Sequence, residues 1–283
     1  MQGLLYHFTD EDGLVGIVES QCLWAVNFKD LNDRTEIQDI LYHIKLYRNA
    51  RSPSAKVMSF CDFTEEVINE FYLDEPERKA DFYLSCFTSD SQSEDLWNNA
   101  KKNGKKEYAL CFSAEKLNHL LSSCEKDFLI GTENIQQVIY DKRLKRKALE
   151  AWRKEYERVV ATGVKDQTAY NMLIRRFICL PALFKNPEGW ANQKEWRIII
   201  RKPLSSLAVS PKDKDRIPKV VYPHKENKRH IKLFNDPKIP GFSGLSEAMQ
   251  GIIIGPSGSW DVVKQLLQFP HLSHLKISHL QQK

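Results

Sequence analysis

Apolar residues along the chain follow two spacings, which predict a mixture of strands and helices. Short apolar runs predict strands at residues 4–8, 22–28, 81–87, 107–112, 134–140, 195–201 and 251–256, with further short strands within 205–234. Apolar residues three and four positions apart predict helices at residues 9–20, 37–52, 63–80, from 114, as a pair across 144–184, and at 259–268. The elements interleave irregularly and no repeat occurs, so the sequence indicates an α+β fold rather than a regular βαβ sheet.

Two polar turns carry the signals of helix starts. Thr9, with Asp12 three residues later, has the pattern of a capping box, and so does Asp33 with Glu36. For the second turn an alternative stays open, in which the loop from Asn32 faces a cleft and orders an acceptor molecule.

Composition adds limits to this picture. The chain has 283 residues, of which 42% are hydrophobic and 28% are charged, as in ordinary globular proteins. No apolar run approaches the ~20 residues that span a bilayer, and the first residues lack a cationic signal region. We therefore expect a cytoplasmic protein without membrane contact. The six cysteines are widely spaced, with no C-x-x-C pair, so we expect buried free thiols and no metal site.

The net charge of +5 hides a division of the chain. Residues 1–100 hold 8 basic and 19 acidic residues, whereas residues 101–283 hold 34 basic and 18 acidic ones. Such a division indicates either an anionic partner for the basic part or attraction between two parts of one fold. The basic helix expected at 142–158 is interrupted by three glutamates, which favours a solvated helix over a nucleic-acid surface.

Several short motifs occur in a fixed order along the chain. They are LYHFT at 5–9, NDRTE at 32–36, SCFT at 85–88 before DLW at 95–97, KEWR at 194–197 and IIIGP at 252–256. This order resembles an uncharacterised, mainly bacterial family of unknown function. The opening is also similar to that of ADP-ribosyltransferases, including DarT-like toxins. The resemblance implies one domain over residues 1–283, built as two small, packed antiparallel sheets with surrounding helices and a helical insertion at about 142–185.

The resemblance also implies an active site that cleaves NAD⁺ and needs no metal. His7 is expected to hold the nicotinamide ribose and amide, and Glu195 to bind the same ribose. The residues expected to contact NAD⁺ are Tyr6, Thr9, Trp24, Ser85 and Arg197. The aromatic residue that stacks on nicotinamide stays open among Trp24, Phe28 and Tyr42.

The chemistry asks for these residue types. Cleavage of the nicotinamide–ribose bond builds positive charge on the ribose, which a carboxylate stabilises and a histidine orients. Alternation along a strand places Glu195 and Arg197 on one face and Trp196 on the other. The simpler interpretation of Glu195 is a salt bridge at the strand end, to Lys194 or Arg197, with no catalytic role, and that of Trp97 is core packing rather than stacking on adenine.

Three functions follow as hypotheses. The first is transfer of ADP-ribose from NAD⁺ to a protein or nucleic-acid acceptor, as in a bacterial toxin or a phage-defence enzyme. The second is hydrolysis of NAD⁺ in the same cleft. The third is a non-catalytic module of the same fold that binds a nucleotide or nucleic acid.

Overall fold

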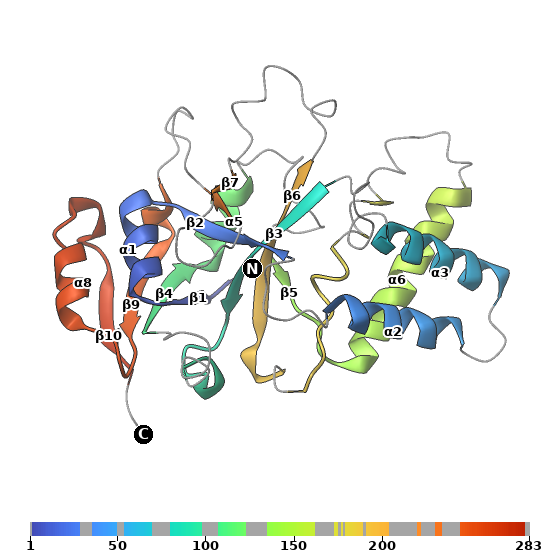
Figure 1. The fold of residues 1–283 in the computed structure, drawn as a ribbon, viewed down its shortest axis with the longest axis horizontal. Helices are drawn as coiled ribbons and strands as arrows, with labels where there is room; N and C mark the ends of the chain where they lie inside the picture. Colours follow the sequence, from blue (N-terminus) through green and yellow to red (C-terminus); the bar gives the residue numbers. More distant parts are fainter. Residues whose placement is uncertain are drawn as a thin grey trace, which may run out of the picture.

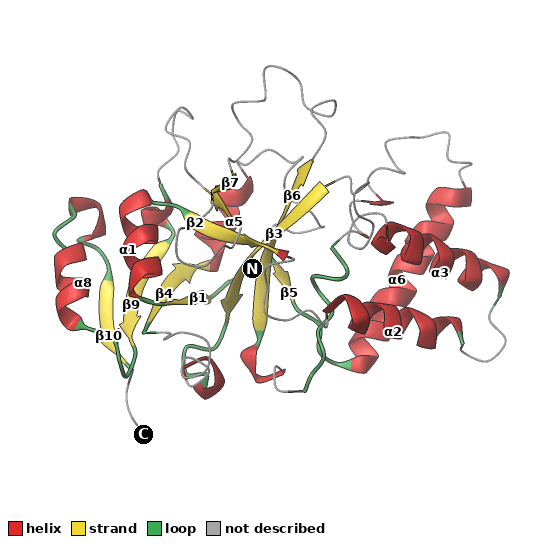
Figure 2. Cartoon of the chain, in the orientation of Figure 1, coloured by secondary structure: helices red, strands yellow, loops and turns green. Residues whose placement is uncertain are grey.

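The strands and helices of the chain form a branched sheet with helices on both faces (Figures 1 and 2). The computed structural model describes residues 2–28, 36–49, 54–69, 80–97, 107–122, 135–161, 173–174, 177, 179–188, 191–203, 220–221, 230–233 and 244–280. The strands are β1 (Leu4–Thr9), β2 (Leu23–Asn27), β3 (Ala80–Thr88), β4 (Tyr108–Ser113), β5 (Gln136–Gln137), β6 (Glu195–Pro203), β7 (Val220–Val221), β8 (His230–Leu233), β9 (Met249–Ile254) and β10 (Lys276–His279). The α-helices are α1 (Glu11–Ser20), α2 (Glu36–Arg48), α3 (Ala55–Ile68), α5 (Ala114–Ser122), α6 (Lys142–Ala161) and α8 (Trp260–Leu266), with short 3₁₀ turns at Ala191–Gln193, Leu245–Glu247 and Pro270–Leu272.

Strand β3 is the point at which the sheet branches. One edge of β3 pairs along its full length with β6, and β5 adds to the far edge of β6. The other edge is shared, because Tyr83 and Leu84 pair with β2 whereas Thr88 pairs with β1. Strands β8 and β7 extend the β2 branch, and β4, β9 and β10 extend the β1 branch. We call the stretch Ser85–Phe87, between the two branches, the fork.

The mixed α+β architecture is therefore confirmed, but the strands differ from the expected two small sheets. Pairing runs without a break through β3, so the described strands form one hydrogen-bonded network of ten strands. The named strands pair antiparallel, with the exception of β9 and β10. The long β3 joins the branches because it is paired on both edges.

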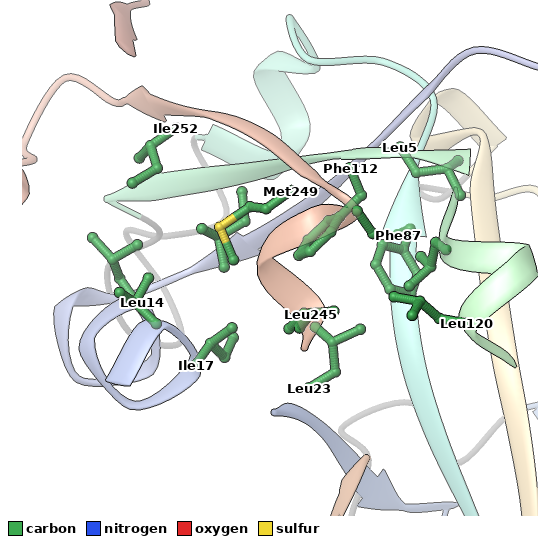
Figure 3. Packing of buried hydrophobic residues seen from close by; sticks show 14 of the residues in the cluster. Leu5, Leu14, Ile17, Leu23, Phe87, Phe112, Leu120, Leu245, Met249 and Ile252 are labelled. Atoms are coloured by element: carbon green, nitrogen blue, oxygen red, sulfur yellow. The ribbon is translucent and has the colours of Figure 1, made fainter. Parts of the chain in front are cut away.

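Each face of the sheet carries its own apolar core. The first core, shown in Figure 3, joins α1, α5 and α8 to the face that includes Leu5, Phe87 and Phe112. The second packs α2, α3 and α6 against the opposite face of β3 and β6, around Leu84 and Ile199. The helical segment expected as an insertion thus belongs, through α6, to a layer that α2 and α3 complete. In the part of the chain that the structure describes, no helix is long and apolar enough to cross a membrane.

Two helices begin at other residues than the sequence predicts. Helix α1 is capped by Asp10, whose carboxylate accepts from the backbone N–H of Gly13, rather than by Thr9. Helix α3 begins at Ala55, well before the expected residue 63, and is capped by Ser54. The cap of α1 shifts by one residue because Thr9 still pairs with Tyr108 as the last residue of β1.

Candidate functional site

The two predicted catalytic residues come from strands that flank the same residue of β3. Thr88 pairs with Tyr6 of β1 on one edge and with Glu195 of β6 on the other. Neighbouring strands lie about 4.8 Å apart, so β1 and β6 are separated by about 10 Å at this level. The fold thus brings His7 and Glu195 to one region of the sheet.

The pairing register, however, directs their side chains to opposite faces. Residues directly paired across antiparallel strands share a face, and successive residues alternate. Glu195 therefore shares its face with Thr88 and Tyr6, whereas His7, the next residue of β1, lies on the other face. Ring contact of His7 with Phe87, at a centroid distance of 5.6 Å, agrees with this placement.

The Glu195 face holds a buried cluster of charges, which we call the ionic cluster. The guanidinium of Arg197 donates Nε to Glu195 Oε1 at 2.7 Å and both terminal nitrogens to Glu36, at 2.7 and 2.6 Å. Lys185 Nζ donates to Glu195 Oε2 at 3.1 Å, and Tyr140 donates its hydroxyl to the same oxygen at 3.2 Å. All four charged residues are buried, and Arg197 is only 1% exposed.

These contacts set the ionisation of Glu195. Burial alone raises the pKa of a carboxyl, but the charges of Arg197 and Lys185 outweigh it and lower the pKa of Glu195 to about 2. Burial next to this carboxylate raises the pKa of the Cys86 thiol to about 12. Glu195 is thus a carboxylate at neutral pH, while Cys86 remains a neutral thiol, which is not nucleophilic.

The opposite face of the fork carries His7 and two polar atoms without partners. His7 Nδ1 lies 2.8 Å from the carbonyl oxygen of Cys86, and because a carbonyl only accepts, Nδ1 carries the hydrogen. The buried Ser85 hydroxyl and the indole nitrogen of Trp196 have no hydrogen-bond partner among the described residues. Ser85 precedes Phe87 by two on β3, and Trp196 pairs with Phe87, so both side chains share the face of His7.

The remaining predicted NAD⁺ contacts are dispersed. Tyr6 lies on the Glu195 face of β1, and burial raises its pKa. Thr9 packs against the start of α1, where a Cβ added to Gly13 would lie 2.0 Å from its hydroxyl. Trp24 covers Gly16 of the same helix. Of the five residues, Ser85 and Thr9 lie on the face of His7, and Arg197 contacts Glu195.

Two other predictions concern residues near these elements. Trp97 is buried against Phe8 in an edge-to-face contact, with a ring-centroid distance of 4.5 Å, which confirms its core role. Both carboxylate oxygens of Glu36 accept from Arg197, so this residue of the expected capping box belongs to the ionic cluster. Asn32 and Asp33 lie outside the described residues.

Sequence reasoning missed three members of the ionic cluster as site residues: Glu36, Lys185 and Tyr140. The separation of 161 residues between Glu36 and Arg197 leaves no local pattern that would connect them. It also missed Trp196, although alternation correctly placed this residue opposite Glu195. Phe87 of β3 is paired with Trp196, and only the pairing of these two distant strands reveals that the two residues are neighbours.

Neither face presents a metal centre in the described chain. Among the described histidine, cysteine, aspartate and glutamate side chains, no group of three or more is arranged to hold a metal ion. Comparisons of the sequence and structure with protein-family models, curated proteins and solved structures found no match.

Proposed function

We propose that the chain binds NAD⁺ at the fork, on the face that carries His7. The observation that carries this proposal is the pair of unpartnered polar atoms, Ser85 Oγ and Trp196 Nε1, on the face that His7 shares with Phe87. A buried hydroxyl without a partner costs about 1–3 kcal/mol, which a ligand with matching polar groups recovers. The ribose hydroxyls and carboxamide of NAD⁺ supply both donors and acceptors of this kind.

The activity that we propose for this site is transfer of ADP-ribose to a protein or nucleic-acid acceptor. The Nδ1–H of His7 donates to the Cys86 carbonyl, which fixes the orientation and tautomer of the neutral imidazole at the fork. In this mechanism His7 orients the ribose while the nicotinamide bond breaks, and positive charge develops on the sugar. Strands β1 and β6 flank Thr88, which brings Glu195 to the same region of the sheet as His7 but leaves its carboxylate on the opposite face.

Binding without catalysis is the second candidate, and the ionic cluster favours it. Both oxygens of Glu195 already accept from cationic groups, and its side chain lies on the face opposite His7. A ribose on the His7 face therefore does not reach this carboxylate in the described geometry. If Glu195 only stabilises the fold, the same site binds the nucleotide without cleaving it.

Incubation with NAD⁺ labelled in the adenine part, together with cell extract as a source of acceptors, distinguishes these functions. Transfer gives labelled macromolecules and free nicotinamide, hydrolysis gives nicotinamide and free ADP-ribose, and a binding module leaves NAD⁺ intact. His7→Ala is expected to abolish turnover or binding, whereas His119→Ala, at an exposed position of α5, is not. Retention of NAD⁺ binding and turnover by a folded His7→Ala variant would overturn the proposed site.

A test of Glu195 requires the fold to be monitored as well. Glu195→Gln preserves the volume of the side chain and removes its charge, and turnover is measured only under conditions in which circular dichroism shows a folded variant. Loss of turnover with NAD⁺ binding retained supports a catalytic carboxylate. Unchanged turnover would show that Glu195 stabilises the fold and takes no part in the reaction.

A further inference from the structure

Helix α6 carries a row of four cations on its outer side. Leu149, Tyr156 and Val159 turn toward the apolar core that α6 shares with α2 and α3. Successive residues of a helix are rotated by about 100° about its axis. Four exposed basic side chains therefore fall within an arc of about 60° on the side opposite these three residues. They are Arg143, Lys147, Lys154 and Arg158, which we call the α6 basic row. It extends for about 22 Å at a rise of about 1.5 Å per residue.

The glutamates that interrupt this helix in sequence lie beside the row. Glu150 and Glu157 both form ion pairs with Arg153, which is mostly buried and outside the row. Glu150 also accepts from Tyr47 of α2. Glu150 and Glu157 are therefore partly neutralised by a cation outside the row, and their positions leave the row itself basic.

The row is also largely free of internal ion pairs. No ion pair within the described ranges engages Arg143, Lys147 or Lys154, and Arg158 forms one with Glu155 in which the arginine is 69% exposed. An exposed pair of this kind is weak and exchanges readily with other anions. The row is therefore available to an external partner.

The first two turns of α6 hold a charge arrangement that is unfavourable for the isolated helix. Exposed Lys142 and Arg146 join Arg143 and Lys147 there, and the first turn contains no acidic residue. Cations at a helix N-terminus are repelled by the helix dipole and by one another. A polyanion bound along the helix would relieve both repulsions. Inside the described fold, Asp141 offsets only part of this repulsion, because its Oδ1 accepts from the backbone N–H groups of Arg143 and Leu144.

We propose that the α6 basic row binds the phosphate backbone of a nucleic acid. Phosphates repeat along a strand, and a straight row of separate cations matches such a linear polyanion. A helix that lies in a membrane surface instead exposes an apolar side to the lipid, and the apolar side of α6 is buried against α2 and α3. This proposal does not rest on the proposed NAD⁺ chemistry, because binding is measured without NAD⁺.

Fluorescence anisotropy with a labelled DNA duplex of about 20 base pairs, and with a single strand of equal length, tests the proposal. The wild-type chain is expected to bind more weakly at about 200 mM salt than at about 50 mM. Replacement of the α6 basic row by four alanines is expected to lower affinity at least about tenfold. It should also reduce the salt dependence by roughly one unit of log–log slope per lost phosphate contact.

The matched control removes four exposed lysines from other elements: Lys56, Lys116, Lys264 and Lys276. This variant has the same net charge as the row variant, so a general effect of charge lowers binding equally in both. Equal losses, or no binding by the wild type at low salt, would overturn the proposal. Circular dichroism is expected to show both variants folded, since every replaced side chain is exposed and all but Lys276 lie on helices, which alanine favours.

Vesicles of phosphatidylserine and phosphatidylcholine provide the competing surface. If the row variant loses vesicle binding but keeps its affinity for nucleic acid, the row is a membrane contact and the proposal fails. Loss of nucleic-acid binding in a variant that still binds or turns over NAD⁺ supports the proposal. Absence of NAD⁺ binding and turnover in the wild type leaves this readout unchanged, so the two proposals fail separately.

Discussion

The two faces of the β3–β6 strand pair differ in whether their buried polar groups have partners. On one face, the ionic cluster buries four charges and gives each of them a partner of opposite sign. On the other, an apolar core surrounds the buried Ser85 hydroxyl, which lacks a partner. Saturated contacts indicate a part of the fold that is costly to disturb, whereas an unmatched polar atom indicates where a ligand would add stability. The charge of Glu195 alone would assign a substrate to the face with the ionic cluster. That face is thus the less suitable of the two.

Removal of the central cation is the strongest way to break the ionic cluster. Arg197→Met leaves the buried carboxylates of Glu36 and Glu195 facing each other with Lys185 as their remaining cation. Loss of one partner from a buried ion pair costs about 3–5 kcal/mol. We expect a decrease of this size in the free energy of unfolding, measured by urea denaturation.

Arg48→Met is the matched control for this change. Arg48 also bonds to two carboxylates, Asp62 and Glu65, but its side chain is 26% exposed. The cost is expected to be about 1 kcal/mol or less. Similar losses for the two variants would show that burial does not distinguish the two arginines, and the ionic cluster would lose its special role.

The sequence predicted one part of this cluster and not the other because the two parts depend on different ranges of interaction. Alternation on a single strand was enough to pair Glu195 with Arg197, and their 2.7 Å contact confirms that interpretation. The sequence assigns Glu36 to a local capping box, and only the structure shows its bidentate contact with the distant Arg197. A buried guanidinium has few alternative partners, so the long-range contact decides the position of this glutamate.

The same limit explains the placement of His7. Apolar spacing predicted β1, β3 and β6 close to their observed bounds, since their strand pattern is local. Whether His7 faces Glu195 depends on which residue of β1 pairs with Thr88, and a shift by one residue reverses every side chain. No pattern within either strand specifies that register, so the sequence located the two residues in one region but not their faces.

A smaller effect on stability is expected when acid protonates Glu195 in the ionic cluster. The folded-state pKa of Glu195 is about 2, against an ordinary value of 4.5. A lowered carboxyl pKa contributes stability that is complete above about pH 4.5 and is lost as the pH falls toward 2. The contribution is on the order of 3 kcal/mol.

Glu195→Gln is therefore expected to lower stability at neutral pH and to flatten the acid limb of the profile. Urea denaturation at several pH values between about 5 and 2 measures both effects. In this range, a variant profile that runs parallel to the wild-type profile would mean that Glu195 is not the carboxylate held ionised by Arg197 and Lys185.

The smallest predicted effect probes the opposite face and separates a packing defect from a binding group. Ser85→Ala removes a buried hydroxyl without a partner, so the free energy of unfolding should rise by about 1 kcal/mol. If Ser85 contacts NAD⁺, the same change weakens NAD⁺ binding about fivefold, as expected for one lost hydrogen bond. Urea denaturation and isothermal titration calorimetry measure the two quantities.

Ser93→Ala provides the comparison that gives this last prediction its meaning. Ser93 is also buried with an unpartnered hydroxyl, but it lies outside β3, two residues from Ser91, whose carbonyl accepts from Trp97. Both variants are expected to gain stability, because each loses an unsatisfied polar atom, while only Ser85→Ala loses NAD⁺ affinity. Equal NAD⁺ affinities in the two variants would identify the Ser85 hydroxyl as a defect of packing, and the fork would then lose the observation on which its assignment as a nucleotide site depends.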